Sequence, residues 1–159
     1  MIRIILIRIR IHWYHSYNSY IGIIIFGMEQ DKGQKKRSVF IIDDDKFLLD
    51  MYALKFNELG FDVLTALSSE DALNLLKESK PDAILLDIVM PGMDGLEFLK
   101  KVKEDHVAES SLIIVLSNLG QESDIDQAKQ IGADGYIVKA SATPGEIVKK
   151  VTEYLEKQK

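Results

Sequence analysis

The sequence of 159 residues contains no cysteine, only three prolines and only three histidines. Without cysteine there is no disulfide framework, no thiolate metal site and no cysteine nucleophile. His12, His15 and His106 have no second metal-ligating residue at a useful spacing, which argues against a catalytic zinc site. The lack of cysteine fits a cytoplasmic location.

Basic residues are too few and too scattered for a nucleic-acid-binding surface. The chain has 20 basic and 25 acidic residues, a formal charge of −5. Arg3, Arg8 and Arg10 lie in a segment without any acid, and without this segment 17 basic residues stand against 25 acidic ones. Because neutralising phosphates requires clustered basic side chains, we expect no nucleic-acid partner.

Residues 1–27 differ in composition from the rest of the chain and are rich in isoleucine. Their longest apolar run, Tyr20–Phe26, is far shorter than the ~20 residues that a membrane span needs, and no signal-peptide cleavage pattern follows it. We therefore expect no membrane span. We interpret 1–27 as a doubtful extension with Met28 as the native start; peripheral contact of this segment with a lipid surface is the alternative. Residues 28–37 are predicted to be a flexible lead-in to a domain at 38–159.

From residue 38 onward, short apolar runs of strand length alternate with segments of helical spacing. The predicted strands are Val39–Ile42, Phe61–Ala66, Ala83–Leu86, Leu112–Leu116 and Tyr136–Val138. Five strands that alternate with five helices predict an α/β fold, in which helices cover both faces of one parallel sheet. The ligand crevice of such a sheet lies beyond the carboxyl ends of its strands.

Capping residues set the limits of the predicted helices. The first extends over Lys46–Leu59 and stops at Gly60. The second is opened by Ser68, with Asp71 three positions later as in a capping box, and extends through Lys80. Apolar residues at helical spacing in the first helix are Phe47, Leu48, Met51, Leu54 and Leu59.

The last three helices show clearer periodicity. The third follows the turn Pro91–Gly95, the fourth ends at Gly132, and the fifth opens with Thr143, Pro144 and Glu146. Their apolar positions are Leu96, Phe98, Leu99 and Val102, then Ile125, Ala128 and Ile131, then Ile147, Val151 and Leu155.

Polar side chains follow four of the five predicted strands. The acids at 43–45 follow the first, Asp87 the third, Ser117 the fourth and Lys139 the fifth. These groups converge on one edge of a parallel sheet. A helix cap would explain acids after the first strand, but three in a row exceed what a cap needs. A surface lysine at a strand end is the alternative interpretation of Lys139.

Four segments occur in a specific order and spacing: Ile41–Asp45, Leu85–Asp87 with Met90–Gly95, Val115–Ser117 and Gly132–Lys139. With them the chain resembles the response-regulator receiver domain of two-component signalling, in its stand-alone single-domain type. The resemblance covers Ser38–Lys159. It implies a flavodoxin-like (βα)5 fold with strand order 2-1-3-4-5.

The resemblance also implies a reaction. Asp87 would accept a phosphoryl group from a phosphohistidine on a sensor histidine kinase or a histidine phosphotransfer protein, and so carry an aspartyl phosphate in a phosphorelay. Mg²⁺ would be bound by Asp43, Asp44, Asp87 and the backbone carbonyl of Val89. The chain would then not be an enzyme, but a phosphoacceptor that assists its own phosphorylation and slow dephosphorylation.

The remaining roles implied by the resemblance concern the switch. Ser117 and Lys139 would contact the arriving phosphoryl group, and Tyr136 would then turn inward. A surface made by the fourth helix, fifth strand and fifth helix would be read by a downstream protein target. The alternative is a receiver-like protein-interaction module that is not phosphorylated in the cell.

Two departures from the family pattern carry expectations of their own. Ala140 stands where the family usually has a proline, often in a cis bond, so we expect a trans bond after Lys139. Val89 and Leu119 are apolar at positions from which a polar side chain could orient an attacking water. We therefore expect slow loss of the phosphoryl group, over minutes or longer.

Overall fold

The computed structural model describes residues 36–157. The expectations for residues 1–27, and for all of the lead-in except Lys36 and Arg37, concern residues outside this range. Within it, none of the helices has the length and apolar character needed to cross a membrane.

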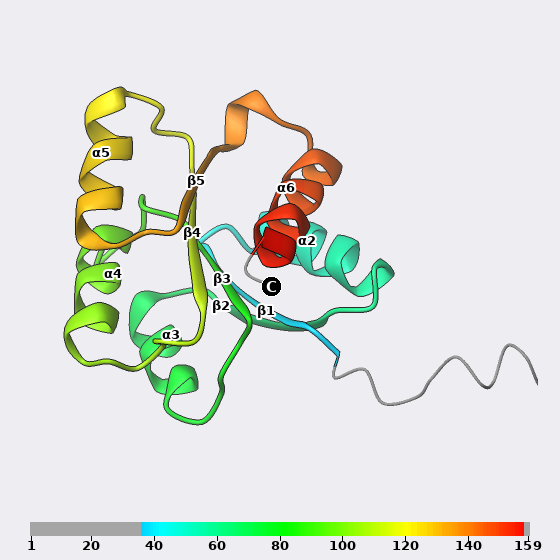
Figure 1. Cartoon of the computed structure of the whole chain (residues 1–159), viewed down its shortest axis with the longest axis horizontal. Coiled ribbons are helices and arrows are strands. Elements are labelled where there is room, and N and C mark those ends of the chain that lie inside the picture. The colour runs from blue at the N-terminus through cyan, green and yellow to red at the C-terminus, as the bar shows by residue number, and fades with distance from the viewer. Residues whose placement is uncertain (1–35, 158–159) are drawn as a thin grey trace, which may run out of the picture. The chain divides into compact units, whose positions relative to one another are not determined.

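The strands form one parallel sheet in the order β2-β1-β3-β4-β5 (Figure 1). Each strand begins within a residue or two of its predicted position, and the predicted α/β fold and strand order are confirmed. The strands are β1 (Ser38–Ile42), β2 (Asp62–Ala66), β3 (Ala83–Leu86), β4 (Leu112–Ser117) and β5 (Gly135–Val138).

Helices cover both faces of the sheet. The elements are α2 (Lys46–Glu58), α3 (Ser69–Leu76), α4 (Gly95–Glu104), α5 (Glu122–Ile131), α6 (Pro144–Lys157) and a short 3-10 turn, η1 (Lys139–Ser141). Figure 1 shows α3, α4 and α5 on one side of the sheet and α2 with α6 on the other. This layered arrangement leaves the strand ends free to carry functional groups.

Alternating residues of the central strands build the two halves of the core. Ile41 and Leu85 pack towards α2 and α6, in the same cluster as Phe56 and Val151. The neighbouring strand residues point the other way, and Ile84 packs in the cluster that includes residues of α3 and α4. Strands buried on both faces explain why the apolar runs in the sequence are continuous rather than alternating.

Several predicted helix ends are confirmed. Gly60 and Gly132 follow α2 and α5 with φ of 81° and 116°, in the left-handed region where glycine is favoured. At the start of α6, both the amide and the hydroxyl of Thr143 donate to the Glu146 carboxylate at 2.8 Å. No peptide bond among residues 36–157 is cis, so the bond after Lys139 is trans as expected.

The second helix is shorter than predicted. It ends at Leu76 instead of continuing through Lys80. The amide of Ser79 donates to the carbonyl of Leu75, and so does its hydroxyl, at 2.8 Å. The amides of residues 77 and 78 donate to carbonyls three residues back. Tight turns and a competing serine hydroxyl end the helix before Pro81 does.

The buried face of α2 matches the apolar residues named from the sequence only in part, since Leu48 and Met51 are partly buried against the core. Leu49, Tyr52 and Phe56 are buried in α2. Phe47, Leu54 and Leu59 are 74%, 57% and 60% exposed. Apolar residues occur around much of this helix, so spacing alone did not identify the side that faces the sheet.

Candidate functional site

Three carboxylates meet at the carboxyl edge of the sheet. Asp43, Asp44 and Asp87 each offer an oxygen, and these oxygens all lie within 4.8 Å of one another. Asp43 and Asp87 are buried, whereas Asp44 is exposed. The cluster is therefore anchored in the protein and open to solvent on one side.

Strand pairing places the two buried acids. In the register of β1 with β3, Ile42 lies opposite Leu86, so that the residues after them are neighbours. The Asp87 amide donates to the Ile42 carbonyl at 2.9 Å, and the Asp43 amide donates to the Ala66 carbonyl at 3.2 Å. Continuation of the parallel ladder thus holds the backbones of both acids.

The third acid of the run has a different role. The Asp45 side chain accepts from the amides of Phe47 at 2.8 Å and Leu48 at 3.2 Å, and so caps α2. The Asp45 amide donates to Asp43 Oδ1 at 3.0 Å. The capping interpretation therefore holds for Asp45 but not for Asp43 and Asp44.

Lys139 reaches across the sheet edge to the acids. Its Nζ lies 2.5 Å from Asp43 Oδ2 and 2.8 Å from Asp87 Oδ2. Only 7% of its side chain is exposed, which excludes the surface-lysine interpretation. In the register of β4 with β5, Ser117 lies opposite Val138, so Ser117 and Lys139 are carried to the same edge.

The ionisation of this cluster reflects burial and pairing. Burial raises the pKa of Asp43 above its ordinary value, although hydrogen bonds from Lys139 and from the Asp45 amide act in the opposite direction. Burial alone would lower the pKa of Lys139, but hydrogen bonds to Asp43 and Asp87 and their negative charges hold it above its ordinary value. The ammonium is therefore charged at neutral pH.

The donor set fits a divalent cation. One ammonium offsets only one of three carboxylates, so two negative charges remain when all three are ionised. Carboxylate oxygens are the ligands that Mg²⁺ prefers, usually with several retained waters. Val89, whose carbonyl is the fourth predicted ligand, donates its amide to Asp87 Oδ1 at 3.2 Å. Its loop is thus attached to the cluster.

The predicted switch residues lie beside the cluster. Ser117 is fully buried, and its Oγ accepts from the Leu119 amide at 3.3 Å. Tyr136 is half-buried and packs against the small cluster that includes Ile88 and Val115. Its hydroxyl donates to the Leu119 carbonyl at 2.8 Å, which ties β5 to the loop after β4.

One buried polar residue near the site was missed by sequence reasoning. Ser69 is fully buried, and its hydroxyl donates to the Met93 carbonyl at 2.8 Å, in the loop that follows Asp87. In the sequence Ser69 stands next to Ser68, and Ser68 alone accounts for the cap of the helix, so no role remained to be assigned to Ser69. Its burial and its partner, 24 residues away, depend on tertiary packing and leave no local signal.

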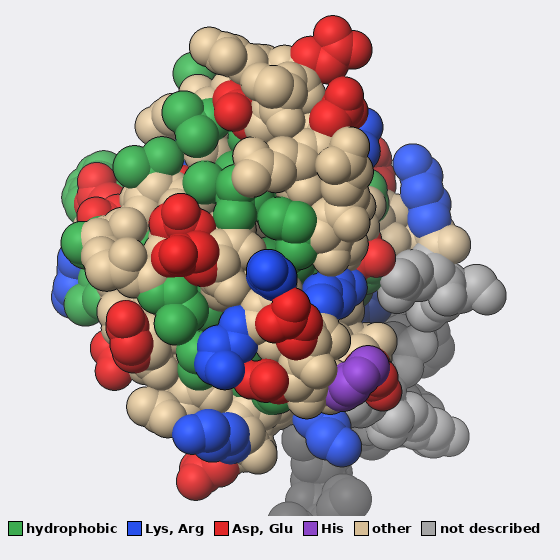
Figure 2. Space-filling view, turned by 90° about the vertical axis from the view of Figure 1, so that its left-hand side faces the viewer, with side chains coloured by type: hydrophobic (Ala, Val, Ile, Leu, Met, Phe, Trp, Pro, Cys, Tyr) green, Lys and Arg blue, Asp and Glu red, His purple; other side chains and the backbone are tan. Residues whose placement is uncertain are grey.

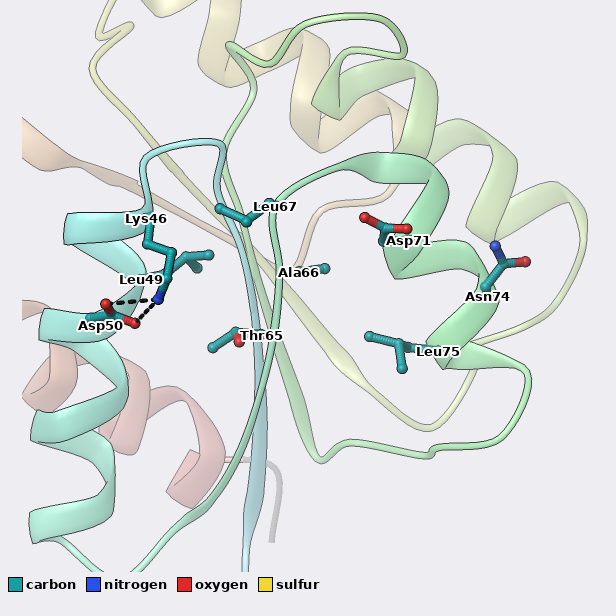
Figure 3. Close-up of a pocket in the computed structure, with 9 residues that line it drawn as sticks. All are labelled: Lys46, Leu49, Asp50, Thr65, Ala66, Leu67, Asp71, Asn74 and Leu75. Carbon is teal, nitrogen blue, oxygen red and sulfur yellow. Dashed lines mark hydrogen bonds and ion pairs between the residues drawn. The ribbon is translucent and has the colours of Figure 1, made fainter.

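A separate hollow of about 510 Å³ lies beside the site rather than around it. Figure 3 shows it between α2 and α3, over the edge strand β2, with Leu67 at its rim and Lys46 bonded to Asp50. None of the three clustered acids lines it. The acidic site is therefore an open edge and not the bottom of this hollow.

Comparison with known proteins agrees with this geometry. Residues 39–152 match the response regulator receiver domain. The phosphate regulon transcriptional regulatory protein PhoB of Pseudomonas aeruginosa is 31% identical over 121 residues, covering 76% of this chain and 52% of PhoB. This chain therefore spans about half the length of that relative.

Solved structures show the same fold. The chemotaxis protein CheY4 of Vibrio cholerae is similar with a TM-score of 0.70 and 26% identity, over 76% of this chain and 99% of that one. The BeF3-activated receiver domain of DrrB, from Thermotoga maritima, has a TM-score of 0.67 and 29% identity, over 77% of this chain and 99% of that one. The chain belongs to the response regulator receiver domain family of two-component systems.

Proposed function

We propose that this receiver domain is phosphorylated on Asp87 by a phosphohistidine of a sensor histidine kinase or a histidine phosphotransfer protein. The observation that carries the proposal is the contact of a buried lysine with the Asp87 carboxylate, inside a cluster of three acids. An aspartate with a fixed cation beside it and an open face towards solvent is suited to accept a phosphoryl group.

In the proposed transfer, an oxygen of Asp87 attacks the phosphorus. The P–O bond forms as the P–N bond to the donor imidazole breaks, and the bonding pair returns to that nitrogen. Negative charge on the three transferring oxygens must be offset. The Lys139 ammonium, 2.8 Å from Asp87 Oδ2, offsets part of it. The Ser117 hydroxyl accepts from an amide and keeps its own proton to donate to a phosphoryl oxygen.

Asp43, Asp44, Asp87 and the Val89 carbonyl are the groups that would hold Mg²⁺. When bound, Mg²⁺ would supply further positive charge at the phosphoryl oxygens. The protein residues prepare this site, since β1 and β3 hold two of the acids buried and Asp44 stays exposed at its open side. Lys139 lowers the cost of keeping Asp43 and Asp87 together before the metal arrives.

The product of the proposed reaction is the modified chain itself. On this proposal the protein is a signalling phosphoprotein and not an enzyme that acts on other molecules. A cytoplasmic location is part of the same proposal. Its only catalysis is assistance to its own phosphorylation and slow dephosphorylation.

The signal would leave through a protein-binding face made by α5, β5 and α6. Tyr136, on β5, joins this face to the loop next to Ser117, because its hydroxyl holds the Leu119 carbonyl. A phosphoryl group on Asp87 that is bonded by the Ser117 hydroxyl would disturb that loop and release the tyrosine. Figure 2 shows the side of the domain that bears α3, α4 and α5, where acidic, basic and hydrophobic side chains are interspersed without a large patch of one charge. Of the proposed face this side includes only α5, and its mixed charge does not favour a nucleic acid there.

Acetyl phosphate with Mg²⁺ tests the proposal. We expect the protein to gain one phosphoryl group by intact mass, and hydroxylamine to remove it, as it does for an acyl phosphate. Asp87→Asn should not be modified, whereas Asp126→Asn, which changes an exposed acid of α5, should be modified normally. An unmodified wild type would favour the unphosphorylated interaction module. An Asp87→Asn protein modified to the same extent would show that another residue is the phosphoacceptor.

A further inference from the structure

A serine of α3 is bonded to the loop that follows Asp87. Ser69 is the first residue of α3 and is fully buried. Its hydroxyl donates to the Met93 carbonyl at 2.8 Å. A buried hydroxyl costs free energy unless it is hydrogen-bonded, so this contact is what makes a serine tolerable here.

Ser69 is not needed to start the helix. The neighbouring Ser68 is the N-cap, and its side chain accepts from the Asp71 amide at 3.1 Å. The first helical position needs no hydroxyl, and alanine has the higher helix propensity there. The side chain of Ser69 therefore serves the loop and not its own helix.

The loop from Ile88 to Asp94 is held close to the acidic cluster at both ends. At its start, the Val89 amide donates to Asp87 Oδ1 at 3.2 Å. At its end, the Gly95 amide donates to the Ile88 carbonyl at 2.9 Å. Within residues 36–157, the bond from Ser69 is the one hydrogen bond that ties this loop to an element other than β3 and α4.

The start of α3 also touches the turn of the loop. A β-carbon at Gly92, which has φ of 76°, would lie 3.5 Å from Glu70 Oε1. Residues 69 and 70 thus lie against residues 92 and 93. The start of α3 thus supports the turn of this loop. Without that support, a short turn that contains a glycine would be free to move.

We propose that Ser69 is a positioning residue for the metal site, because its hydroxyl fixes the loop that carries Val89. This inference rests on the proposed function, in which the Val89 carbonyl is a Mg²⁺ ligand. With the hydroxyl present, the loop is held in one arrangement before the metal binds. Without it, the Met93 carbonyl loses its partner, and part of the binding free energy of Mg²⁺ is used to order the loop.

The chain provides a matched control for this hydroxyl. Ser111 is also buried, and its Oγ donates to the Pro81 carbonyl at 2.6 Å. That bond joins the segments that precede β4 and β3, at the opposite end of the strands from the acidic cluster. Ser69→Ala and Ser111→Ala therefore remove the same kind of bond, one next to the site and one far from it.

Calorimetric titration with MgCl₂ is the first test. We expect Ser69→Ala to weaken Mg²⁺ binding by about 3- to 10-fold, the range expected when one net hydrogen bond is lost. Ser111→Ala should leave the affinity unchanged. Ser69→Thr keeps the hydroxyl and should recover most of the wild-type affinity.

Amide hydrogen exchange of the metal-free proteins is the second test, and it does not depend on metal binding. The Val89 amide should exchange faster in Ser69→Ala by a similar factor, but not in Ser111→Ala. Unchanged exchange, or an equal increase in both variants, would overturn the positioning role. Equal Mg²⁺ affinities of the wild type and Ser69→Ala would also overturn the positioning role. A wild type that binds no Mg²⁺ would instead refute the proposed metal site.

Discussion

Gly95 packs so closely against Asp87 that a β-carbon at position 95 would lie 2.0 Å from the Asp87 carbonyl oxygen. The same β-carbon would lie 2.7 Å from the Cα of Ile88. Both neighbours are backbone atoms that cannot turn away. The start of α4 can therefore approach the segment that follows β3 only because residue 95 has no side chain.

Replacement of this glycine should be costly. We expect Gly95→Ala to lower the free energy of unfolding by about 1–3 kcal/mol, as overpacking in a buried site does. Urea unfolding followed by circular dichroism measures this change. In Gly145→Ala the new methyl meets nothing within 4 Å, so that variant should equal or exceed wild-type stability. A Gly95→Ala protein as stable as Gly145→Ala would contradict the close approach.

Magnesium should stabilise the metal-free protein by binding only its folded state. If the dissociation constant is about 1 mM, 10 mM Mg²⁺ adds about 1.4 kcal/mol. Asp44→Asn removes the exposed ligand of the cluster and should abolish most of the rise in Tm. It also removes one of three close carboxylates, so its Tm without metal should not fall.

The control for this measurement is an exposed aspartate of α2, the helix that follows Asp44 in the chain. Asp50 bonds Lys46 at 2.7 Å and is not part of the acidic cluster. Asp50→Asn should therefore keep the full thermal response to Mg²⁺. A wild-type Tm that does not change with Mg²⁺, with calorimetry also showing no binding, would count against the site.

The hydroxyl of Tyr136 should favour the unphosphorylated arrangement of the loop after β4. Tyr136→Phe removes its bond to the Leu119 carbonyl and should shift the amide resonances of residues 118–120 towards those of the phosphorylated protein. Tyr154, whose ring packs on Gly135, is the control, and Tyr154→Phe should leave those resonances in place. Unchanged resonances in both variants would mean that Tyr136 is only a half-buried aromatic residue.

The sheet and the position of its functional edge could be predicted because they depend on local patterns. Continuous apolar runs marked the strands, and the acids, serine and lysine that follow them marked the edge. Parallel pairing then brings Asp43 and Asp87 together without further information. The strand order came from the family resemblance and not from spacing.

Features that depend on contacts between distant residues could not be predicted. Phe47 and Leu54 are as apolar as the buried Phe56 of the same helix, and only the position of the sheet decides which of them is covered. The roles of Ser69 and Asp45 could not be predicted for the same reason. Nothing local distinguishes a serine that bonds a distant loop from one that caps a helix. Nor does anything local distinguish the aspartate that caps α2 from its two neighbours in the acidic cluster.

The lifetime of the phosphoryl group is expected to be long, and two exposed apolar side chains give the reason. Val89 and Leu119 lie two residues beyond Asp87 and Ser117 and are 57% and 40% exposed. Neither side chain can donate or accept a hydrogen bond, so neither side chain can orient a water for attack on phosphorus. We expect loss of the phosphoryl group over minutes or longer, measured by intact mass after removal of acetyl phosphate.

Polar substitution should shorten this lifetime only where it can reach the phosphoryl group. Val89→Gln and Leu119→Gln each place an amide beside the site, and at least one should accelerate the loss by more than about 3-fold, within the range for a positioned polar group. Leu67, which is 44% exposed, lies at the end of β2, with β1 between it and the strand of Asp87. Leu67→Gln should therefore leave the lifetime unchanged. A wild-type lifetime of seconds would show that another group in this chain already orients the water, and that the two apolar side chains do not limit hydrolysis.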